Sequence, residues 1–523
     1  MGRRLLLLGA LLGVVIVACE TANRGYLGDG GAGDAQVACA KGQSRCGDAC
    51  SDLVSDVTNC GACGVTCGPD TLCCAGACNA TASCSLSLEQ PAPATGWQNG
   101  GGYLTLRGQG FSAGMKAFIG DGRAPLRFID STSARIVLPP GPLGPQDIKI
   151  VVAGASAVLP KGFAYTSGQL GSPWQQKPMK RVRGEDPGVA VMQDGRVLVA
   201  GGTLVPDKPD MATNTVEIYT RESDTVTQPA ALMSSPRWQN SAVTLLDGRV
   251  LIVGGACGLA LGDCNGNPRS ADLFDPLTET LRPTVGPLNV PRAYTRAVLL
   301  GDGRVLVASG NDASLEVYDP DKDTFTVVPG KAKHIFGFLV RLRDGRALLG
   351  GGDGGVTAAE IFDPDTNALV PAGALAQARS MLSAHTLPDG RVLIIGGSSM
   401  SAGAVKEPLD TVETWDPATG AFALLPLKMS QPRTWHASAL VRDGTILVMG
   451  GYTLSGHCDS LTNTVDQIDP VNGTVKPFAI LLNANTEWNA VTLLDGSVLG
   501  VGGGACGTSM ALPDLDFLPG GPG

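Results

Sequence analysis

Short apolar runs alternate with turn-forming residues along most of the chain. The clearest example is residues 387–397 (LPDGRVLIIGG), where an Asp-Gly pair separates two apolar runs and a glycine pair follows. Asp-Gly between apolar runs is a strong local signal for a β-hairpin, because both turn residues must tolerate a positive φ. The pattern predicts antiparallel β-strands joined by tight turns.

This segment occurs seven times, at intervals of 42 to 55 residues. Its turn aspartates are Asp194, Asp247, Asp302, Asp344, Asp389, Asp443 and Asp495. Most copies are followed by a third strand-like run that contains an acid, such as 360–364 (EIFDP), whose Asp-Pro starts a turn into a fourth strand. The interval is close to the period of a four-stranded propeller blade. Residues 168–523 are therefore predicted to form a seven-bladed β-propeller, in which an orphan strand at 168–179 completes the last blade beside 512–518.

The chain of 523 residues has a formal net charge of −9 and 72 glycines, and only 17% of its residues are charged. Its length predicts several domains. Abundant glycine with few charges is typical of turn-rich, well-buried β structure, so an all-β fold class is expected. The acidic balance and the absence of a basic run argue against a nucleic-acid partner.

The N-terminus has the features of a targeting segment. Residues 1–18 combine a basic start with an apolar run that is too short to span a bilayer as a stable anchor. The run ends in IVAC and resembles the lipobox of bacterial lipoproteins, which implies that Cys19 carries a lipid and that the exported chain is anchored to the cell envelope, at the outer membrane or cell surface. The alternative is an ordinary secretory signal with an incidental cysteine. Residues 19–38 are predicted to be a flexible tether.

Residues 39–84 contain ten cysteines and almost no aliphatic run that could form a core. The even count, the absence of histidine and the predicted export favour five disulfides over a metal cluster. Their pairing stays open. The run 59–67 (NCGACGVTC) resembles small cysteine-rich modules of exported bacterial surface proteins.

Residues 85–167 differ from the cysteine-rich segment, because they contain strand-like apolar runs. The run 103–111 (YLTLRGQGF) is followed by short strand-like runs and closes with 162–165 (GFAY). The segment resembles an IPT/TIG domain, an immunoglobulin-like β-sandwich. That resemblance implies a spacer or adhesion module, and no constellation for chemistry is visible in it.

The order of strands, Asp-Gly turns, glycine pairs and Asp-Pro turns in 168–523 resembles kelch repeats. With its Asp-Gly-Arg-Val runs, it is similar to the kelch propeller of galactose-oxidase-like proteins. That resemblance implies a copper-radical site made from a tyrosine cross-linked to a cysteine, a Tyr-His pair and a second histidine.

This chain matches that copper site only in part. Tyr294 falls at the cross-linked tyrosine, but the neighbouring blade has Gln239 in place of the cysteine, and Trp435 replaces the tyrosine before His436. A single histidine of the set cannot hold copper, so we expect no catalytic residue, no metal and no other cofactor. The remaining histidines match no ligand position of that family; they are His334, His385 and His457.

Arginines recur ten positions before the turn in several repeats. They are Arg237, Arg292, Arg379 and Arg433. They could ring a central channel and attract an anion, but pairing with the repeated acids of the third strand is favoured, because buried charges need partners. The long loops on the opposite side from the turns contain four cysteines, for which Cys257–Cys264 and Cys458–Cys506 are candidate disulfides.

The best functional candidates are residues that break the repeat at or just after the arginine position. They are Trp238, Tyr294, Phe336, Trp435, His436, Glu487 and Trp488. Aromatic rings at a channel mouth could anchor a ligand, but packing between blades is slightly favoured for them. The sequence therefore favours a surface-displayed binding protein for a protein, peptide or glycan. An enzyme of the galactose-oxidase-like class with a degenerate or unrecognised site is the alternative.

Overall fold

The computed structural model describes residues 86–519 and short stretches between 44 and 79. The gaps within 86–519 are 153–154, 172–174, 182, 185, 205–211, 257–268, 309–312, 331–333, 402–403, 455–459, 482 and 505–513. No α-helix occurs in the described residues, so the predicted all-β class is confirmed, and none of them forms a helical segment suited to crossing a membrane.

Several predictions concern residues outside these ranges. They are the signal peptide 1–18 with the tether 19–38 and Cys19, and the loop cysteines Cys257, Cys264, Cys458 and Cys506.

Six of the ten N-terminal cysteines form disulfides, as predicted, and the side chains of the other four lie outside the described residues. Two small hairpins are present, β1 (Ser44–Cys46) with β2 (Ala49–Ser51), and β3 (Leu72–Cys74) with β4 (Ala77–Asn79). The described bonds are Cys46–Cys63, Cys60–Cys73 and Cys67–Cys78. These bonds interlace along the chain, so each of them constrains the loop that the next one closes.

Residues 87–166 form a β-sandwich. One sheet contains β5 (Ser87–Leu88), β7 (Tyr103–Gln109), β10 (Leu126–Asp130) and β11 (Ser133–Val137). The other contains β6 (Thr95–Trp97), β8 (Lys116–Ile119), β9 (Gly122–Ala124), β12 (Gly144–Val152) and β13 (Ala155–Thr166). Side chains alternate between the two faces of a strand, so Leu104 and Leu106 of β7 enter one core together with Ile148, Ile150 and Phe163 of the facing sheet.

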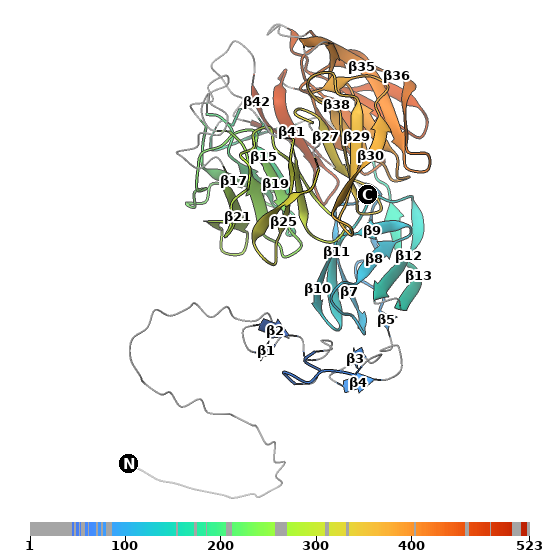
Figure 1. Cartoon of the computed structure of the whole chain (residues 1–523). Helices are drawn as coiled ribbons and strands as arrows, with labels where there is room; N and C mark the ends of the chain where they lie inside the picture. Colours follow the sequence, from blue (N-terminus) through green and yellow to red (C-terminus); the bar gives the residue numbers. More distant parts are fainter. Residues whose placement is uncertain are drawn as a thin grey trace, which may run out of the picture.

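Residues 175–518, which we call the sheet ring, form consecutive antiparallel sheets (Figure 1). The first contains β15 (Gly188–Val191), β16 (Val197–Ala200), β17 (Val216–Thr220) and β18 (Thr225–Thr227). The second contains β19 (Ser241–Thr244), β20 (Val250–Val253), β21 (Ala271–Asp275) and β22 (Thr280–Pro283). The third contains β23 (Arg296–Leu299), β24 (Val305–Ala308), β25 (Leu315–Asp319) and β26 (Thr324–Val328). The fourth contains β27 (Phe338–Arg341), β28 (Ala347–Gly350), β29 (Ala358–Asp363) and β30 (Ala368–Ala374).

The fifth sheet is larger and contains β31 (Arg379–Ser380), β32 (Ser383–Thr386), β33 (Val392–Ile395), β34 (Ser398–Ser401), β35 (Ala404–Asp416) and β36 (Ala421–Arg433). The next contains β37 (Ala437–Leu440), β38 (Ile446–Met449), β39 (Thr464–Asp469) and β40 (Thr474–Ile480). The last joins β41 (Thr486–Thr492), β42 (Val498–Gly504) and β43 (Asp514–Leu518) to β14 (Gln175–Pro178). This pairing of β14 with β43 is the predicted union of the orphan strand with the last repeat.

The inner strands are the first full strands of the repeats, namely β15, β19, β23, β27, β32, β37 and β41. Each contacts the next, and β15 also contacts β41, so the inner strands form a closed cycle. Each inner strand leads into an Asp-Gly turn, and we call this side of the ring the turn end. We call the opposite side, where the inner strands begin, the mouth.

The second strand of each repeat forms the core, because it lies between two neighbours and is buried on both faces. In β33 every residue from Val392 to Ile395 is fully buried. The hairpin before it is fixed by its own aspartate, since Oδ1 of Asp389 accepts a hydrogen bond from the backbone N–H of Arg391. The same bond recurs in the other Asp-Gly turns, as the repeated sequence requires.

The glycine pairs join neighbouring sheets. Gly396 and Gly397 have φ values of +56° and +87°, and a Cβ on Gly396 would lie 2.8 Å from the carbonyl oxygen of Arg433 in the next repeat. The N–H of Gly397 donates to that same carbonyl at 2.8 Å. Only glycine combines these dihedral angles with so close an approach. The glycine pair therefore places each repeated arginine against the preceding sheet.

The β-sandwich packs on the turn end (Figure 1). Nε1 of Trp97 donates to the carbonyl of Leu494, and the guanidinium of Arg442 lies 4.9 Å from the centroid of the Trp97 ring. On the fourth sheet, Arg123 forms a bidentate ion pair with Asp365 at 2.9 and 3.0 Å. The segment that the resemblance implied to be a spacer is thus in direct contact with the sheet ring.

Candidate functional site

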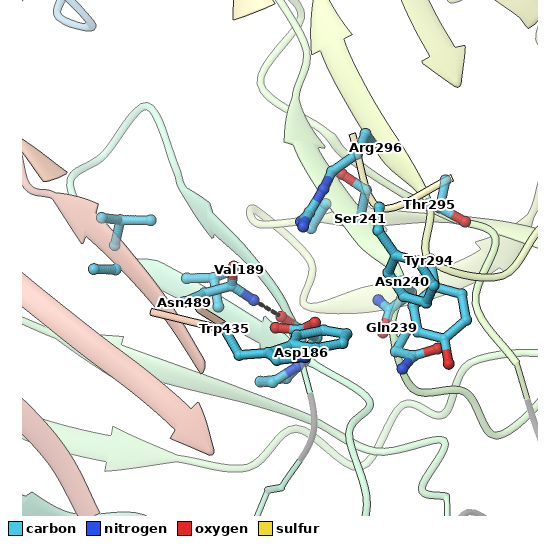
Figure 2. Close-up of a pocket in the computed structure, with 15 residues that line it drawn as sticks. Asp186, Val189, Gln239, Asn240, Ser241, Tyr294, Thr295, Arg296, Trp435 and Asn489 are labelled. Carbon is cyan, nitrogen blue, oxygen red and sulfur yellow. Dashed lines mark hydrogen bonds between the residues drawn. The ribbon is translucent and has the colours of Figure 1, made fainter. Parts of the chain in front are cut away.

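Among the described residues, two cavities open at the mouth of the sheet ring, with volumes of about 100 and 200 Å³. They share the lining residues Asp186, Arg296, Trp435, Asn489 and Ala490, so they are parts of one hollow between the inner strands. Figure 2 shows the side chains around the first cavity.

Aromatic side chains from different sheets form an arc at this hollow. The Trp238 and Tyr294 rings are 6.2 Å apart, Tyr294 and Phe336 are 4.1 Å apart, and Phe336 and Trp435 are 5.4 Å apart, measured between centroids. All three pairs meet edge to face, an arrangement that stabilises aromatic contacts by about 0.5–1.5 kcal/mol each. The arc therefore contributes packing between sheets and also presents ring surface to the cavity.

The backbone just before the inner strands is held in an unusual conformation. Left-handed φ values, from +45° to +59°, occur at Asp186, Gln239, Tyr294, Phe336, Met381 and Trp435. Such a conformation costs roughly 1–3 kcal/mol in a residue other than glycine and persists only where the surroundings fix it. Here it is fixed by bonds to the neighbouring sheet, such as Met381 N–H to the Phe336 carbonyl at 2.8 Å. The ring thus places chemically different side chains at equivalent positions around the mouth.

Polar groups line the interior of the hollow. Asp186 and Arg296 face both cavities, and burial raises the pKa of Asp186 although the Arg296 charge opposes that shift. Asn240 is 5% exposed, and neither atom of its amide has a partner among the described residues. Nδ2 of Asn489 donates to the Pro187 carbonyl at 2.8 Å (Figure 2). None of these four polar residues was singled out in the sequence, because no motif or spacing connects them.

Two histidines lie between the inner strands of the fifth and sixth repeats. Nε2 of His436 is 2.9 Å from Oγ of Ser383, and Nε2 of His385 is 2.6 Å from Oγ of Ser438. Burial lowers the pKa of His436 to about 3 and that of His385 to about 4. Both imidazoles are therefore neutral at pH 7, and their bonds join two inner strands.

The four predicted arginines do not line the cavities. Each is buried and pairs with an acid of its own repeat: Arg237–Asp272 at 2.6 Å, Arg292–Glu316 at 3.1 Å, Arg379–Glu413 at 2.7 Å and Arg433–Asp466 at 3.1 Å. Burial lowers the pKa of Arg379, and the Glu413 charge limits that effect. These arginines stabilise the individual repeats, so they are not available to attract an anion in a central channel.

Two repeats vary this ion pair. Arg183 pairs with Glu217 at 3.2 Å but lies eleven residues before its turn, so the ten-residue spacing missed it. In the fourth repeat His334 replaces the arginine, with Nε2 at 2.5 Å from Glu360 and Nδ1 at 2.7 Å from the Gly351 carbonyl.

The remaining candidates differ in position. Trp238 stands at the end of the arc, whereas Trp488 is 3% exposed and packs in the core of the sixth and last repeats while touching the second cavity. Glu487 lies in β41, and its side chain is outside the described residues.

The donors at the mouth do not fit a copper centre. Copper needs several imidazole, thiolate or phenolate ligands, but Gln239 and Trp435 occupy two of the positions concerned, and Nε2 of His436 contacts Ser383. Among the described residues, one group of three His, Cys, Asp or Glu side chains has its ligand atoms within 4.8 Å of one another. It consists of Cys60, Cys67 and Cys78, and all three are disulfide-bonded.

Comparisons with known proteins agree with this architecture. The IPT/TIG family model matches residues 89–166, so this predicted domain is confirmed. Beta-scruin from Limulus polyphemus, a kelch-like relative, is 29% identical over 171 residues, which are 29% of this chain and only 18% of beta-scruin. A fungal alcohol oxidase of the AA5 family, in complex with copper, has a similar structure, with a TM-score of 0.54 and 17% identity over 68% of this chain and 77% of the oxidase. At that identity the likeness shows a galactose-oxidase-like fold and nothing about activity.

Proposed function

We propose that residues 168–523 form a seven-bladed kelch-type β-propeller that binds a ligand at its mouth. The seven consecutive sheets, the closed cycle of inner-strand contacts and the pairing of β14 with β43 support this architecture. The β-sandwich covers part of the turn end, which leaves the mouth as the side on which the central hollow opens.

The observation that carries the proposal is the meeting of the aromatic arc with unpartnered polar groups in one hollow. A concave site that combines ring surface with a few convergent polar groups is the usual form of a binding pocket. Large rings such as Trp435 are favoured anchors for a partner. The ligand is a protein, a peptide or a glycan, and the small hollow would receive one projecting group of it.

Arrays of peptides and glycans would test this proposal. Replacing Trp435 by alanine should weaken binding at least tenfold, because the loss of a central aromatic anchor costs about 2 kcal/mol or more. The matched control is Leu277→Ala in an Asp-Pro turn, where the side chain is 92% exposed and a loss of binding is not expected. Unchanged binding by the Trp435→Ala protein would contradict the proposal, and no ligand on either array would exclude its peptide and glycan forms.

We further propose that the chain is exported and lipid-anchored through Cys19, so that the mouth is displayed at the cell envelope. The lipobox-like end of residues 1–18 supports this location. Metabolic labelling with a fatty-acid analogue should mark the wild type and leave the Cys19→Ala variant unlabelled. Equal labelling of the two would show that the cysteine is not the attachment site.

The alternative function is an enzyme of the galactose-oxidase-like class, and the fold likeness is what favours it. Stoichiometric copper bound by the purified chain, together with oxidation of an alcohol, would support this alternative. The donor set at the mouth gives no reason to expect that result.

A further inference from the structure

Asp186 and Arg296 are an unusual pair of charges in the sheet ring. Asp186 precedes β15, Arg296 begins β23, and both line both cavities. They influence each other electrostatically, yet among the described residues neither side chain has a hydrogen-bond or ion-pair partner. The repeated arginines, by contrast, touch their acids directly, as Arg379 and Glu413 do at 2.7 Å. The hollow therefore holds two opposite charges that leave space between them.

Amide groups beside this pair are also unoccupied. Asn240 and Gln239 are each 5% exposed, and both amide atoms of Asn240 and Oε1 of Gln239 lack a partner among the described residues. Both residues line the first cavity. A buried amide is costly unless something satisfies it. Asn240 can both donate and accept, so it suits a ligand that carries both kinds of group.

The third feature is the apolar wall. Tyr294, Phe336 and Trp435 line the same first cavity and are held by their edge-to-face contacts. The cavities measure about 100 and 200 Å³, below the roughly 300–1,000 Å³ of pockets that enclose drug-sized molecules. The hollow thus fits a group of about one amino-acid residue with an apolar substituent.

We propose that the mouth binds a small zwitterion, a free amino acid or a very short peptide. Its ammonium group faces Asp186, its carboxylate faces Arg296, and its apolar side chain lies against the aromatic arc. A guanidinium pairs well with a carboxylate because it can donate two parallel hydrogen bonds. This inference rests on the proposed binding function and narrows the peptide ligands to the smallest ones, down to a single amino acid.

Calorimetric titration of the full chain tests the role of each charge. The probes are L-phenylalanine and L-alanyl-L-phenylalanine, each compared with its N-acetylated and C-amidated forms. The free forms should bind at least ten times more tightly than either blocked form. In the Asp186→Asn protein the preference for a free ammonium should disappear, and in the Arg296→Gln protein the preference for a free carboxylate should disappear. Asp389→Asn, in an exposed turn at the other end, should keep both preferences.

The remaining outcomes separate this inference from the proposed function. A screen of the twenty amino acids in the same assay extends the probes to every side chain, and no binding by any of them would overturn the inference. The inference would also be overturned if D-glucose or an array ligand binds, loses affinity in the Trp435→Ala protein and keeps its affinity in both charge variants. That result would leave the proposed binding function intact. If Trp435→Ala changes no binding of any kind, both proposals are wrong. Circular dichroism and the melting temperature of each variant establish that it is folded.

Discussion

The two ends of the sheet ring contrast in how their polar groups are used. At the turn end each Asp-Gly aspartate bonds to its own hairpin, and several charged side chains pair with the β-sandwich, as Asp365 does with Lys116 and Arg123. At the mouth, Asp186 and Arg296 interact only through their charges, and the amide of Asn240 has no partner among the described residues. The aspartate contact is the same in every Asp-Gly turn, whereas the residues that line the hollow differ from one repeat to the next.

This contrast separates stability from recognition within one scaffold. Polar groups that pair with each other stabilise the fold and are not available to bind a ligand. Groups left unpaired cost stability, and proteins retain such costs mainly at functional sites. The repeated arginines and the unpaired residues of the mouth should therefore respond to substitution in opposite ways.

The largest effect is expected at a framework ion pair. Arg379→Ala should lower the free energy of unfolding by about 3–5 kcal/mol, because the variant leaves Glu413 buried without its partner. Arg391→Ala is the matched control in the same sheet, where the Arg391–Asp389 pair is exposed to solvent and should contribute about 0–1 kcal/mol. Urea denaturation measures both values. Similar losses for the two variants would remove the distinction between framework and surface charges.

A smaller effect is expected where the β-sandwich meets the turn end. Trp97→Ala removes the hydrogen bond to Leu494 and the contact with Arg442, which together should contribute about 2 kcal/mol. In calorimetry the β-sandwich should then unfold before the sheet ring. Leu143→Ala, at a side chain that is 55% exposed in the same domain, should leave a single transition. A single, unshifted transition for Trp97→Ala would mean that the interface contributes little.

Sequence predicted the repeated framework much better than the residues that line the hollow, for a physical reason. The Asp-Gly turns, the glycine pairs and the arginine–acid pairs are local or repeated, so the sequence pattern of one repeat predicts the structure of the others. Asp186, Asn240, Arg296 and Asn489 lie in different repeats, and only closure of the ring brings them together. The aromatic residues were found because they interrupt a repeated position. Aligning the residue two places after each repeated arginine would also have found Gln239 and Met381, which share the left-handed conformation.

The smallest expected effect is on the pH dependence of the free energy of unfolding, which should have opposite signs for Asp186 at the mouth and Asp365 at the turn end. Burial raises the pKa of Asp186 above the ordinary aspartate value of 3.8. The stability that this shift gives the wild type is therefore fully present below pH 3.8, and it is lost as the pH rises through the raised pKa. Asp186→Asn should consequently increase the free energy of unfolding at pH 7, and this gain should vanish as the pH falls below that ordinary value.

Asp365 is the matched control at the turn end. Burial opposes the shift there, but hydrogen bonds from Lys116 and Arg123 outweigh it and hold the pKa of Asp365 below the ordinary value. Asp365→Asn should therefore destabilise the protein at pH 7, and the loss should fade as the pH falls through that lowered pKa. Urea denaturation of both variants at several pH values measures the two slopes. Slopes of the same sign would contradict the division between a paired end and an unpaired mouth, because that division requires ionised Asp186 to cost stability and ionised Asp365 to provide it.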